Sequence, residues 1–457
     1  MNRSLALAAL LGLLAFTAGA DEAAPPSATL EGRPAAADLS PLQSRLDAAL
    51  PGETIVVEAG TYPGDLLIEK PLHLVGRDRP LLLGSGHGSV VRVRAAGVTI
   101  EGFDLDGRGG GDLGRDASGI HVAAEGASIR RCNIRGSLFG VYLREAHGAA
   151  VEGSVIEGIP GKEAGEKGSG IHVWNTRGFR LEDNRISDTR DGLYVQSSSH
   201  GVVRGNVARD LRYGLHYMFS DDNLFEDNRF ENGAAGTALM YSKRIVFRRN
   251  QLVRNRGFAS VGLLLKACDE VVAEDNLIAD NARGLFLEGS YRNVFRGNVV
   301  ASSDTAIVLY DSCGENRFEG NTFVANLSPL TLVGRRTDTV FAGNYWSDHL
   351  EPDLDGDGIS DRPYRLSNVF DHFRGNLTAA DLMAQGPGAR ALAAAEQVFP
   401  VLDPIPVEDR TPLARPPASR APRAAAAEGR ADLGGLAGSL ALLGGGLMLF
   451  VRGRRRG

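Results

Sequence analysis

Three consecutive segments of equal length decide the fold: SGIHVWNTRGFRLEDNRISDTR (169–190), DGLYVQSSSHGVVRGNVARDLR (191–212) and YGLHYMFSDDNLFEDNRFENGA (213–234). Each spans 22 residues and carries a glycine at its second position and an asparagine at its sixteenth. Short alternating apolar runs between Gly and Asn corners, repeated with this period, are typical of a parallel β-helix in which each segment forms one coil. We therefore predict an all-β chain folded as a right-handed parallel β-helix.

The repeat extends in both directions from these segments. The glycine column comprises Gly119, Gly140, Gly170, Gly192, Gly214, Gly236, Gly262 and Gly284, and the asparagine column Asn184, Asn206, Asn228, Asn250, Asn276, Asn298, Asn321 and Asn344. Stacked asparagines are expected to hydrogen bond along one corner. With irregular opening coils from residue 50, we predict about twelve coils over residues 50–348, after a leader or cap at 21–49.

Composition limits the class of protein. The chain has 457 residues, of which 58 are glycine without a collagen period, and 43% are hydrophobic, which is enough for a core. Its formal net charge of −6 gives no reason to expect nucleic acid as a partner. The three cysteines are widely spaced, so we expect free buried thiols and no zinc motif.

Both ends read as targeting segments. Residues 1–20 combine an early arginine, an apolar run and a small-residue cleavage site, which predicts a signal peptide and export to the periplasm. Residues 404–432 are rich in Pro and Ala and predict a flexible linker. The uncharged stretch 433–451, followed by the basic tail 452–457, predicts a transmembrane helix anchored in the inner membrane, with a cleaved sorting tail as the alternative.

Alternation along the strand that follows each ladder glycine places every second side chain on the outer face. One outward column reads His121, Tyr142, His172, Tyr194, His216, Ala238, Leu264 and Phe286. The other reads Ala123, Arg144, Trp174, Gln196, Met218, Met240, Lys266 and Glu288. Two of the five methionines in the chain therefore stand in one column, beside a run of histidine and tyrosine.

This outward stripe predicts a metal site. His216 and Met218 lie two residues apart on one strand, and Met240 is the expected neighbour of Met218 on the next coil. An imidazole with two thioethers is a soft ligand set that suits Cu(I). His172 lies two coils from His216, about 9–10 Å away, so it would hold a neighbouring site. The alternative is a contact patch for a partner protein that includes Trp174 and Tyr194.

The segment 349–403 begins with a calcium-like loop. Asp353, Asp355, Asp357 and Asp361 occupy alternating ligand positions of an EF-type loop, with Gly358 at the turn. Tyr364 stands where such a loop carries its bidentate glutamate. The segment predicts a calcium site, and its alternative is an acidic surface turn.

Four phrases resemble a known family: YGLHYMFSDDN (213–223), GNYWSD (343–348), DLDGDGISDRPYRL (353–366) and FPV (399–401). They are similar to the periplasmic copper-binding family of nitrous-oxide reductase maturation factors, within the wider group of carbohydrate-binding and sugar-hydrolase β-helices, and the similarity spans about residues 45–415. It implies a non-enzymatic protein that supplies copper to nitrous-oxide reductase. It also implies an ABC transporter ATPase, its membrane subunit and a copper chaperone lipoprotein as partners.

The rival function is enzymatic. Parallel β-helices also include polysaccharide lyases, hydrolases and epimerases, which need carboxylates or a Tyr/His base on one face. Asp191 with Tyr194, or Asp221 and Asp222 near His216, would be the candidates. A docking platform without metal is the third possibility.

Overall fold

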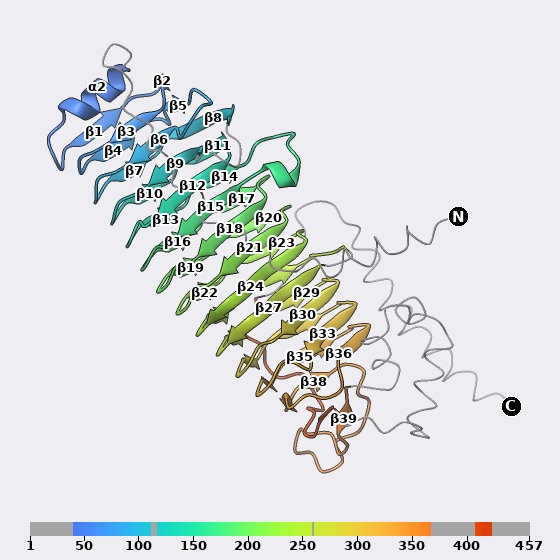
Figure 1. Cartoon of the computed structure of the whole chain (residues 1–457). Helices are drawn as coiled ribbons and strands as arrows, with labels where there is room; N and C mark the ends of the chain where they lie inside the picture. Colours follow the sequence, from blue (N-terminus) through green and yellow to red (C-terminus); the bar gives the residue numbers. More distant parts are fainter. Residues whose placement is uncertain (1–39, 111–116, 258–259, 367–406, 423–457) are drawn as a thin grey trace, which may run out of the picture. The chain divides into compact units, whose positions relative to one another are not determined.

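The repeat seen in the sequence folds into stacked coils. The computed structural model describes residues 40–110, 117–257, 260–366 and 407–422. The chain divides into two units, residues 1–422 and 423–457, and the second lies outside the described residues. In the first unit each coil contributes short strands to three long parallel sheets, which Figure 1 shows stacked coil upon coil.

The three sheets are named A, B and C. Sheet A contains, in spatial order, β1 (Thr54–Val57), β4 (His73–Gly76), β7 (Thr99–Glu101), β10 (Ser128–Arg130), β13 (Ala150–Glu152), β16 (Arg180–Glu182), β19 (Val202–Arg204), β22 (Leu224–Glu226), β25 (Val246–Arg248), β28 (Val272–Glu274), β31 (Val294–Arg296), β34 (Arg317–Glu319), β37 (Val340–Ala342), β40 (Glu408–Asp409) and β39 (Tyr364–Arg365). Sheet B contains β2 (Thr61–Pro63), β5 (Leu81–Leu83), β8 (Asp104–Gly110), β11 (Asn133–Ser137), β14 (Val155–Glu157), β17 (Arg185–Ser187), β20 (Val207–Arg209), β23 (Arg229–Glu231), β26 (Gln251–Val253), β29 (Leu277–Ala279), β32 (Val299–Ala301), β35 (Thr322–Val324) and β38 (Tyr345–Trp346). Sheet C contains β3 (Leu66–Ile68), β6 (Val91–Val93), β9 (Ser118–Val122), β12 (Phe139–Arg144), β15 (Ser169–Trp174), β18 (Asp191–Gln196), β21 (Tyr213–Met218), β24 (Ala235–Lys243), β27 (Val261–Asp269), β30 (Arg283–Glu288), β33 (Thr305–Tyr310) and β36 (Ser328–Val333).

The predicted all-β parallel helix is confirmed, with one more coil than expected. Sheet B has 13 strands within the described residues, against the predicted twelve coils. The difference arises in the opening coils, where Thr54 pairs with His73, His73 with Thr99 and Thr99 with Ser128. The number of residues between paired positions differs from one opening coil to the next, and the repeat near 22 residues begins only after them. The sequence therefore shows no clear period in this region.

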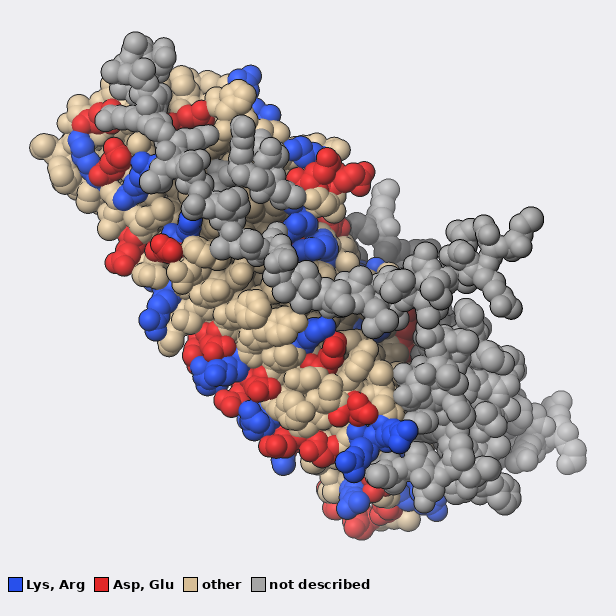
Figure 2. Space-filling view, in the orientation of Figure 1, with Lys and Arg blue, Asp and Glu red and all other residues tan. Residues whose placement is uncertain are grey.

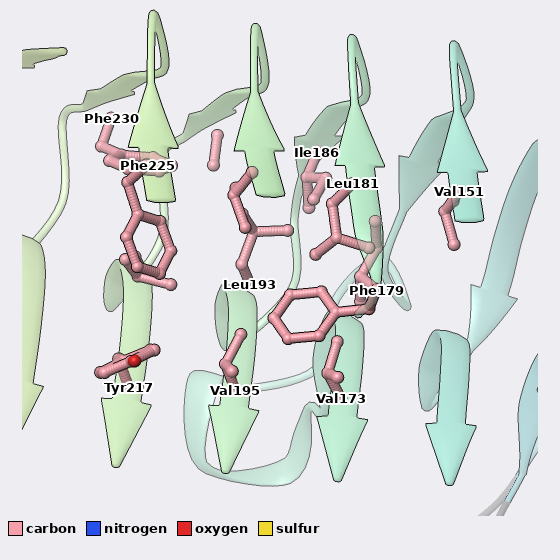
Figure 3. Close-up of a cluster of buried hydrophobic side chains, with 14 of the residues drawn as sticks. Val151, Val173, Phe179, Leu181, Ile186, Leu193, Val195, Tyr217, Phe225 and Phe230 are labelled. Atoms are coloured by element: carbon pink, nitrogen blue, oxygen red, sulfur yellow. The ribbon is translucent and has the colours of Figure 1, made fainter. Parts of the chain in front are cut away.

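Inward-facing side chains of all three sheets fill the bore. Figure 3 shows Val173, Val195 and Tyr217 of sheet C meeting side chains of sheets A and B, such as Leu181 and Phe230. These residues occupy the alternate strand positions whose side chains point into the bore, so they are fully or almost fully buried. The alternation that fills the bore therefore turns the intervening side chains outward.

The asparagine column forms the predicted ladder. Asn228 is representative: its backbone N–H donates to Asn250 Oδ1 at 3.0 Å, and its side-chain amide donates to the same oxygen and to the Val203 carbonyl. The pattern repeats from Asn184 to Asn344 and ends on the Asp409 carboxylate. Each coil corner therefore satisfies its buried backbone groups and fixes the register of the next coil.

Each end of the β-helix is covered by a non-repeating element. Helix α2 (Pro41–Ala48) begins after Ser40, whose side chain accepts from the Gln43 N–H, and it buries Leu42 and Leu46 against the first coils. At the other end β40 pairs with β37 and with β39. This corrects the prediction of a flexible linker over the whole of residues 404–432, because Asp409 is completely buried under the last coil.

Two other sequence predictions concern cysteines and the membrane. Cys132, Cys268 and Cys313 are free and buried, as expected, and burial raises the pKa of the Cys132 thiol to about 11. Within the described residues, every helix is too short or too polar to cross a bilayer. The predicted signal peptide 1–20 and transmembrane helix 433–451 lie outside the described residues.

Candidate metal site

The outward columns of sheet C lie where the alternation predicted. The pairing of β15, β18, β21 and β24 places Tyr194 between His172 and His216, and Met218 directly beside Met240. In Figure 2 the middle coils present a largely uncharged surface, with acidic and basic side chains gathered along its edges. The register on which the metal prediction depends is therefore confirmed.

Histidine and tyrosine rings alternate along this face. The stack runs from His121 through Tyr142, His172 and Tyr194 to His216, with centroid separations of 5.1, 4.6, 4.4 and 4.7 Å. Rings at these separations gain dispersion and quadrupole stabilisation. The ring planes meet at angles from 21° to 86°, so each imidazole packs against a tyrosine ring on at least one side.

Two of these imidazoles are held neutral. Burial, aided by neighbouring arginines, lowers the pKa of His121 to about 4, and burial with Arg190 lowers the pKa of His172 to about 3. Nε2 of His121 and Nδ1 of His172 are buried and have no hydrogen-bond partner among the described residues. A neutral imidazole has one nitrogen with a lone pair, so these rings have the chemistry of metal ligands.

His216 is held differently, by a buried carboxylate. Its Nδ1 lies 3.2 Å from Asp191 Oδ2 and 3.4 Å from an Arg212 nitrogen. Arg212 forms a two-bond ion pair with Asp191, at 2.8 and 2.5 Å, and Arg190 lies 3.6 Å from the same carboxylate. Burial alone would raise the pKa of Asp191, but the hydrogen bonds from His216 and Arg212 hold it well below its usual range.

The two methionines complete the donor set on the same face. Met218 Sδ lies 3.9 Å from the Tyr194 hydroxyl, whose ring contacts that of His216. Met240 packs against a small apolar cluster outside the bore, formed by Ala235, Ala238, Val261 and Leu264. Both methionine side chains are half-buried. One imidazole and two thioethers on adjacent strands fit Cu(I), which prefers soft sulfur ligands together with imidazole.

His172 is separated from His216 by one tyrosine ring. The Tyr194 ring lies between the two imidazoles, with centroids 4.4 and 4.7 Å away. This agrees with the expectation that His172 belongs to a neighbouring site, and its role as a ligand stays a prediction.

The contact stripe proposed as the alternative fits the structure only in part. Trp174 is half-buried, with the Arg144 guanidinium 5.4 Å from its ring centroid. Tyr194 is only 3% exposed, since its ring lies between two imidazoles, tilted against His172 and edge-on to His216, and its hydroxyl bonds to Gln196. Tyr194 therefore offers almost no surface to a partner, which corrects that part of the prediction.

The acidic loop brings three of its four predicted ligands together. One carboxylate oxygen each from Asp353, Asp355 and Asp357 lie within 4.8 Å of one another. Asp361 accepts from the Leu354 N–H instead. Tyr364 donates to Asp348 and stacks on Trp346, so it takes no part in the loop.

The carboxylates suggested for an enzyme are engaged elsewhere. Asp221 and Asp222 form ion pairs with Arg244 at a coil corner, away from the imidazole stack. Asp191 is paired with Arg212 and His216 rather than with Tyr194. Sequence reasoning missed this pairing, because Arg212 precedes the strand of His216 and reaches back one coil.

Comparison with known proteins defines the family. A model of the family described as "Periplasmic copper-binding protein (NosD)" matches residues 159–365. A "Probable ABC transporter binding protein NosD" of Pseudomonas aeruginosa is 32% identical over 376 residues, covering 79% of this chain and 88% of that protein. The chain belongs to the NosD family. A NosD of Stutzerimonas stutzeri with the same description is 30% identical, covering 79% of this chain and 87% of that protein.

The fold has wider relatives than NosD proteins. A right-handed β-helix model matches residues 91–223, in agreement with the predicted hand. The A-modules of the Azotobacter vinelandii mannuronan C-5 epimerases AlgE6 and AlgE4 superpose with TM-scores of 0.57 and 0.53. Both are 17% identical to this chain and cover 65% of it, matching 93% and 94% of their own lengths. This likeness concerns the fold, whereas the similarity to NosD proteins concerns the family.

Proposed function

We propose that this NosD-family protein binds Cu(I) on the outer face of sheet C and supplies it for the assembly of the copper centres of nitrous-oxide reductase. His216, Met218 and Met240 are the proposed ligands, and His172 holds a second, neighbouring position. The observation that carries the proposal is the side-by-side pairing of Met218 and Met240 next to an oriented imidazole.

The chemistry of the surroundings supports copper as the cargo. Hard cations such as Ca²⁺ and Mg²⁺ take oxygen ligands, and the stripe offers thioether sulfur and imidazole nitrogen instead. The apolar cluster beside Met240 limits water around the site. Low water access favours the weakly hydrated Cu(I) ion over its competitors.

The proposed setting is the periplasm, with an ABC transporter as partner. The family is described as periplasmic, and the two curated relatives are described as ABC transporter binding proteins. We extend this to the transporter's ATPase and membrane subunits and to a copper chaperone lipoprotein that supplies the ion. The same proposal includes export through the signal peptide 1–20 and anchoring through residues 433–451.

A titration under anaerobic conditions tests the ligands. Purified protein competes for Cu(I) with a chromophoric chelator, and wild type is compared with Met218→Leu/Met240→Leu, which keeps apolar volume and removes both sulfurs. We expect the affinity to fall by more than about 100-fold. Phe286→Leu is the matched control, since Phe286 packs against the same outer cluster without a donor atom.

Three results would contradict the proposal. Undiminished copper binding in the double variant would remove the two methionines as ligands. Absence of copper binding in the wild type, with retained binding to the transporter subunits, would favour a metal-free docking platform. Depolymerisation or epimerisation of an acidic polysaccharide would favour the enzymatic alternative.

We also propose that the Asp353–Asp357 loop binds Ca²⁺. Its support is the convergence of three carboxylates from alternating positions, and the missing twelfth ligand limits the expected affinity. The ion would act as a structural staple next to the last coil.

A further inference from the structure

Asp191 is the buried carboxylate on the outer face of sheet C. Its side chain has no exposed surface, and it lies in the position that precedes the ladder glycine of β18. The paired positions on the neighbouring strands are Ser169 and Tyr213, neither of which carries a charge. Because a small neutral residue satisfies this position in the adjacent coil, packing alone does not account for the aspartate.

The contacts of Asp191 determine which nitrogen of His216 carries the proton. An ionised carboxylate can only accept hydrogen bonds, and Oδ2 lies 3.2 Å from Nδ1. If Nδ1 lacked a proton, two lone pairs would face each other at this distance. A proton on Nδ1 removes that repulsion and completes a charge-assisted hydrogen bond.

Arg212 also approaches Nδ1, and this contact allows the opposite tautomer to be considered. The guanidinium nitrogen is 3.4 Å from Nδ1 but only 2.5 Å from Asp191 Oδ2. This nitrogen carries two protons: one lies on the short bond to Oδ2, and the contact that the other could make with Nδ1 is longer than the 3.2 Å between Nδ1 and the carboxylate. Arg190 adds a second cation beside the carboxylate. Arg212 therefore fixes the Asp191 carboxylate in place through two hydrogen bonds, and the carboxylate selects the tautomer.

We infer that Asp191 is a positioning residue of the copper site, which holds His216 with its proton on Nδ1 and leaves Nε2 as the nitrogen that binds the ion. The inference rests on the proposed function, since it names the atom through which His216 acts. No hydrogen bond to Nε2 is found within the described residues, in contrast to the occupied Nδ1.

The tautomer is tested on the copper-free protein. Long-range ¹H–¹⁵N correlation spectra of the ¹⁵N-histidine-labelled full chain distinguish protonated from unprotonated ring nitrogens, and His216→Gln assigns the signal. We expect Nδ1 of His216 to be protonated and Nε2 unprotonated in the wild type. In Asp191→Asn, which has a similar shape but no charge, we expect both tautomers to be populated. A wild-type signal with the proton on Nε2 would overturn the inference whether or not copper binds.

Copper affinity supplies the second measurement. Carboxylates that hydrogen bond to a metal-binding histidine contribute about 10–100-fold to metal affinity, so Asp191→Asn is expected to weaken Cu(I) binding by that factor. Asp188→Asn is the matched control, because Asp188 also forms an ion pair near this coil corner, with Lys167, but does not contact His216. Its affinity is expected to stay within about twofold of the wild type, since it lies outside the ligand's hydrogen-bond chain.

The outcomes separate this inference from the proposed function. If His216→Gln weakens copper binding and Asp191→Asn does not, the ligand stands and the positioning role is wrong. If the wild type does not bind Cu(I), the proposed function fails, but the spectrum still shows whether Asp191 holds the proton of His216 on Nδ1. Should Asp191→Asn fail to fold, the wild-type spectrum and Asp191→Glu, which returns the charge at a longer reach, decide the question.

Discussion

Replacing Asp409 tests whether the segment after residue 406 closes the β-helix. Its Oδ1 accepts from the Gly343 and Thr411 backbone N–H groups, at 3.2 and 3.1 Å. Its Oδ2 accepts from the Asn344 backbone and side-chain nitrogens and from the Trp346 indole, at 3.0, 2.9 and 3.2 Å. One buried carboxylate thus terminates the asparagine ladder and holds β40 on the last coil.

The cost of Asp409→Ala follows from the donors that lose their acceptor. Asn344 and Trp346 are almost fully buried, so the Asn344 backbone N–H and the indole N–H would have no acceptor. Each orphaned donor costs about 1–3 kcal/mol, whereas removal of a buried charge returns part of that loss. We therefore expect a destabilisation of about 2–4 kcal/mol. Asp409→Asn retains one acceptor oxygen and is expected to lose about half as much.

Urea unfolding monitored by tryptophan fluorescence measures this effect. The chain has two tryptophans, so a Trp174→Phe background makes Trp346 the reporter of the last coil. We expect its transition to move to lower urea and to precede the loss of the far-UV circular dichroism of the other coils, because repeat proteins open locally.

Glu408→Gln is the control for Asp409→Ala. Its carboxylate pairs with the exposed Arg410, and loss of an exposed pair costs at most about 1 kcal/mol. If Asp409→Ala and Glu408→Gln shifted the Trp346 transition equally, Asp409 would not be what closes the helix, and the hydrogen-bond argument would be refuted.

Two further predictions concern calcium and pH. A Ca²⁺ concentration 100 times the dissociation constant should stabilise the protein by about 2.7 kcal/mol, as a higher unfolding midpoint. Asp353→Asn/Asp355→Asn should abolish the shift, and an equal shift in that variant would exclude the loop. Burial lowers the pKa of His121 from 6.5 to about 4 in the folded protein. The contribution of this histidine to stability is therefore fully present above pH 6.5 and is lost as the pH drops towards 4. His121→Gln should reduce that fall by about 1–2 kcal/mol, allowing for partial exposure, in urea unfolding at pH 7 and pH 4.5, and an unchanged fall would contradict the assignment.

The register of the middle coils could be predicted because it depends on local chemistry. Gly214 and Asn228 mark fixed corners, and the alternation between them determines which side chains fill the bore. Once two coils share this register, Met218 and Met240 must be neighbours on one face, which the structure confirms. The opening coils carried too few such markers, and the count was one coil short.

The remaining features depend on contacts between residues without a repeat. Asp191 meets Arg212 across a coil corner, and only the rotamers of two long side chains decide that meeting. Asp409 continues a column of asparagines after a gap of 65 residues from Asn344, so no spacing identifies it. Asp409 is recognised only by counting hydrogen bonds in the last regular coil, where the nitrogens of Asn344 need an acceptor that no further asparagine of the repeat supplies.

The same face of a β-helix can serve catalysis or metal binding, and proton affinity distinguishes the two uses. A general base works best with a pKa near the operating pH, whereas His172, with a pKa of about 3, takes up almost no proton at neutral pH. A metal ligand has the opposite need, because a proton competes with the ion for the lone pair. Burial between two tyrosine rings therefore makes this histidine a poor base and leaves its ring unprotonated at neutral pH, as a metal ligand requires. The likeness to epimerases concerns the path of the backbone, while the environment of His172 suits a metal ligand better than a general base, in keeping with the copper-binding description of the NosD family.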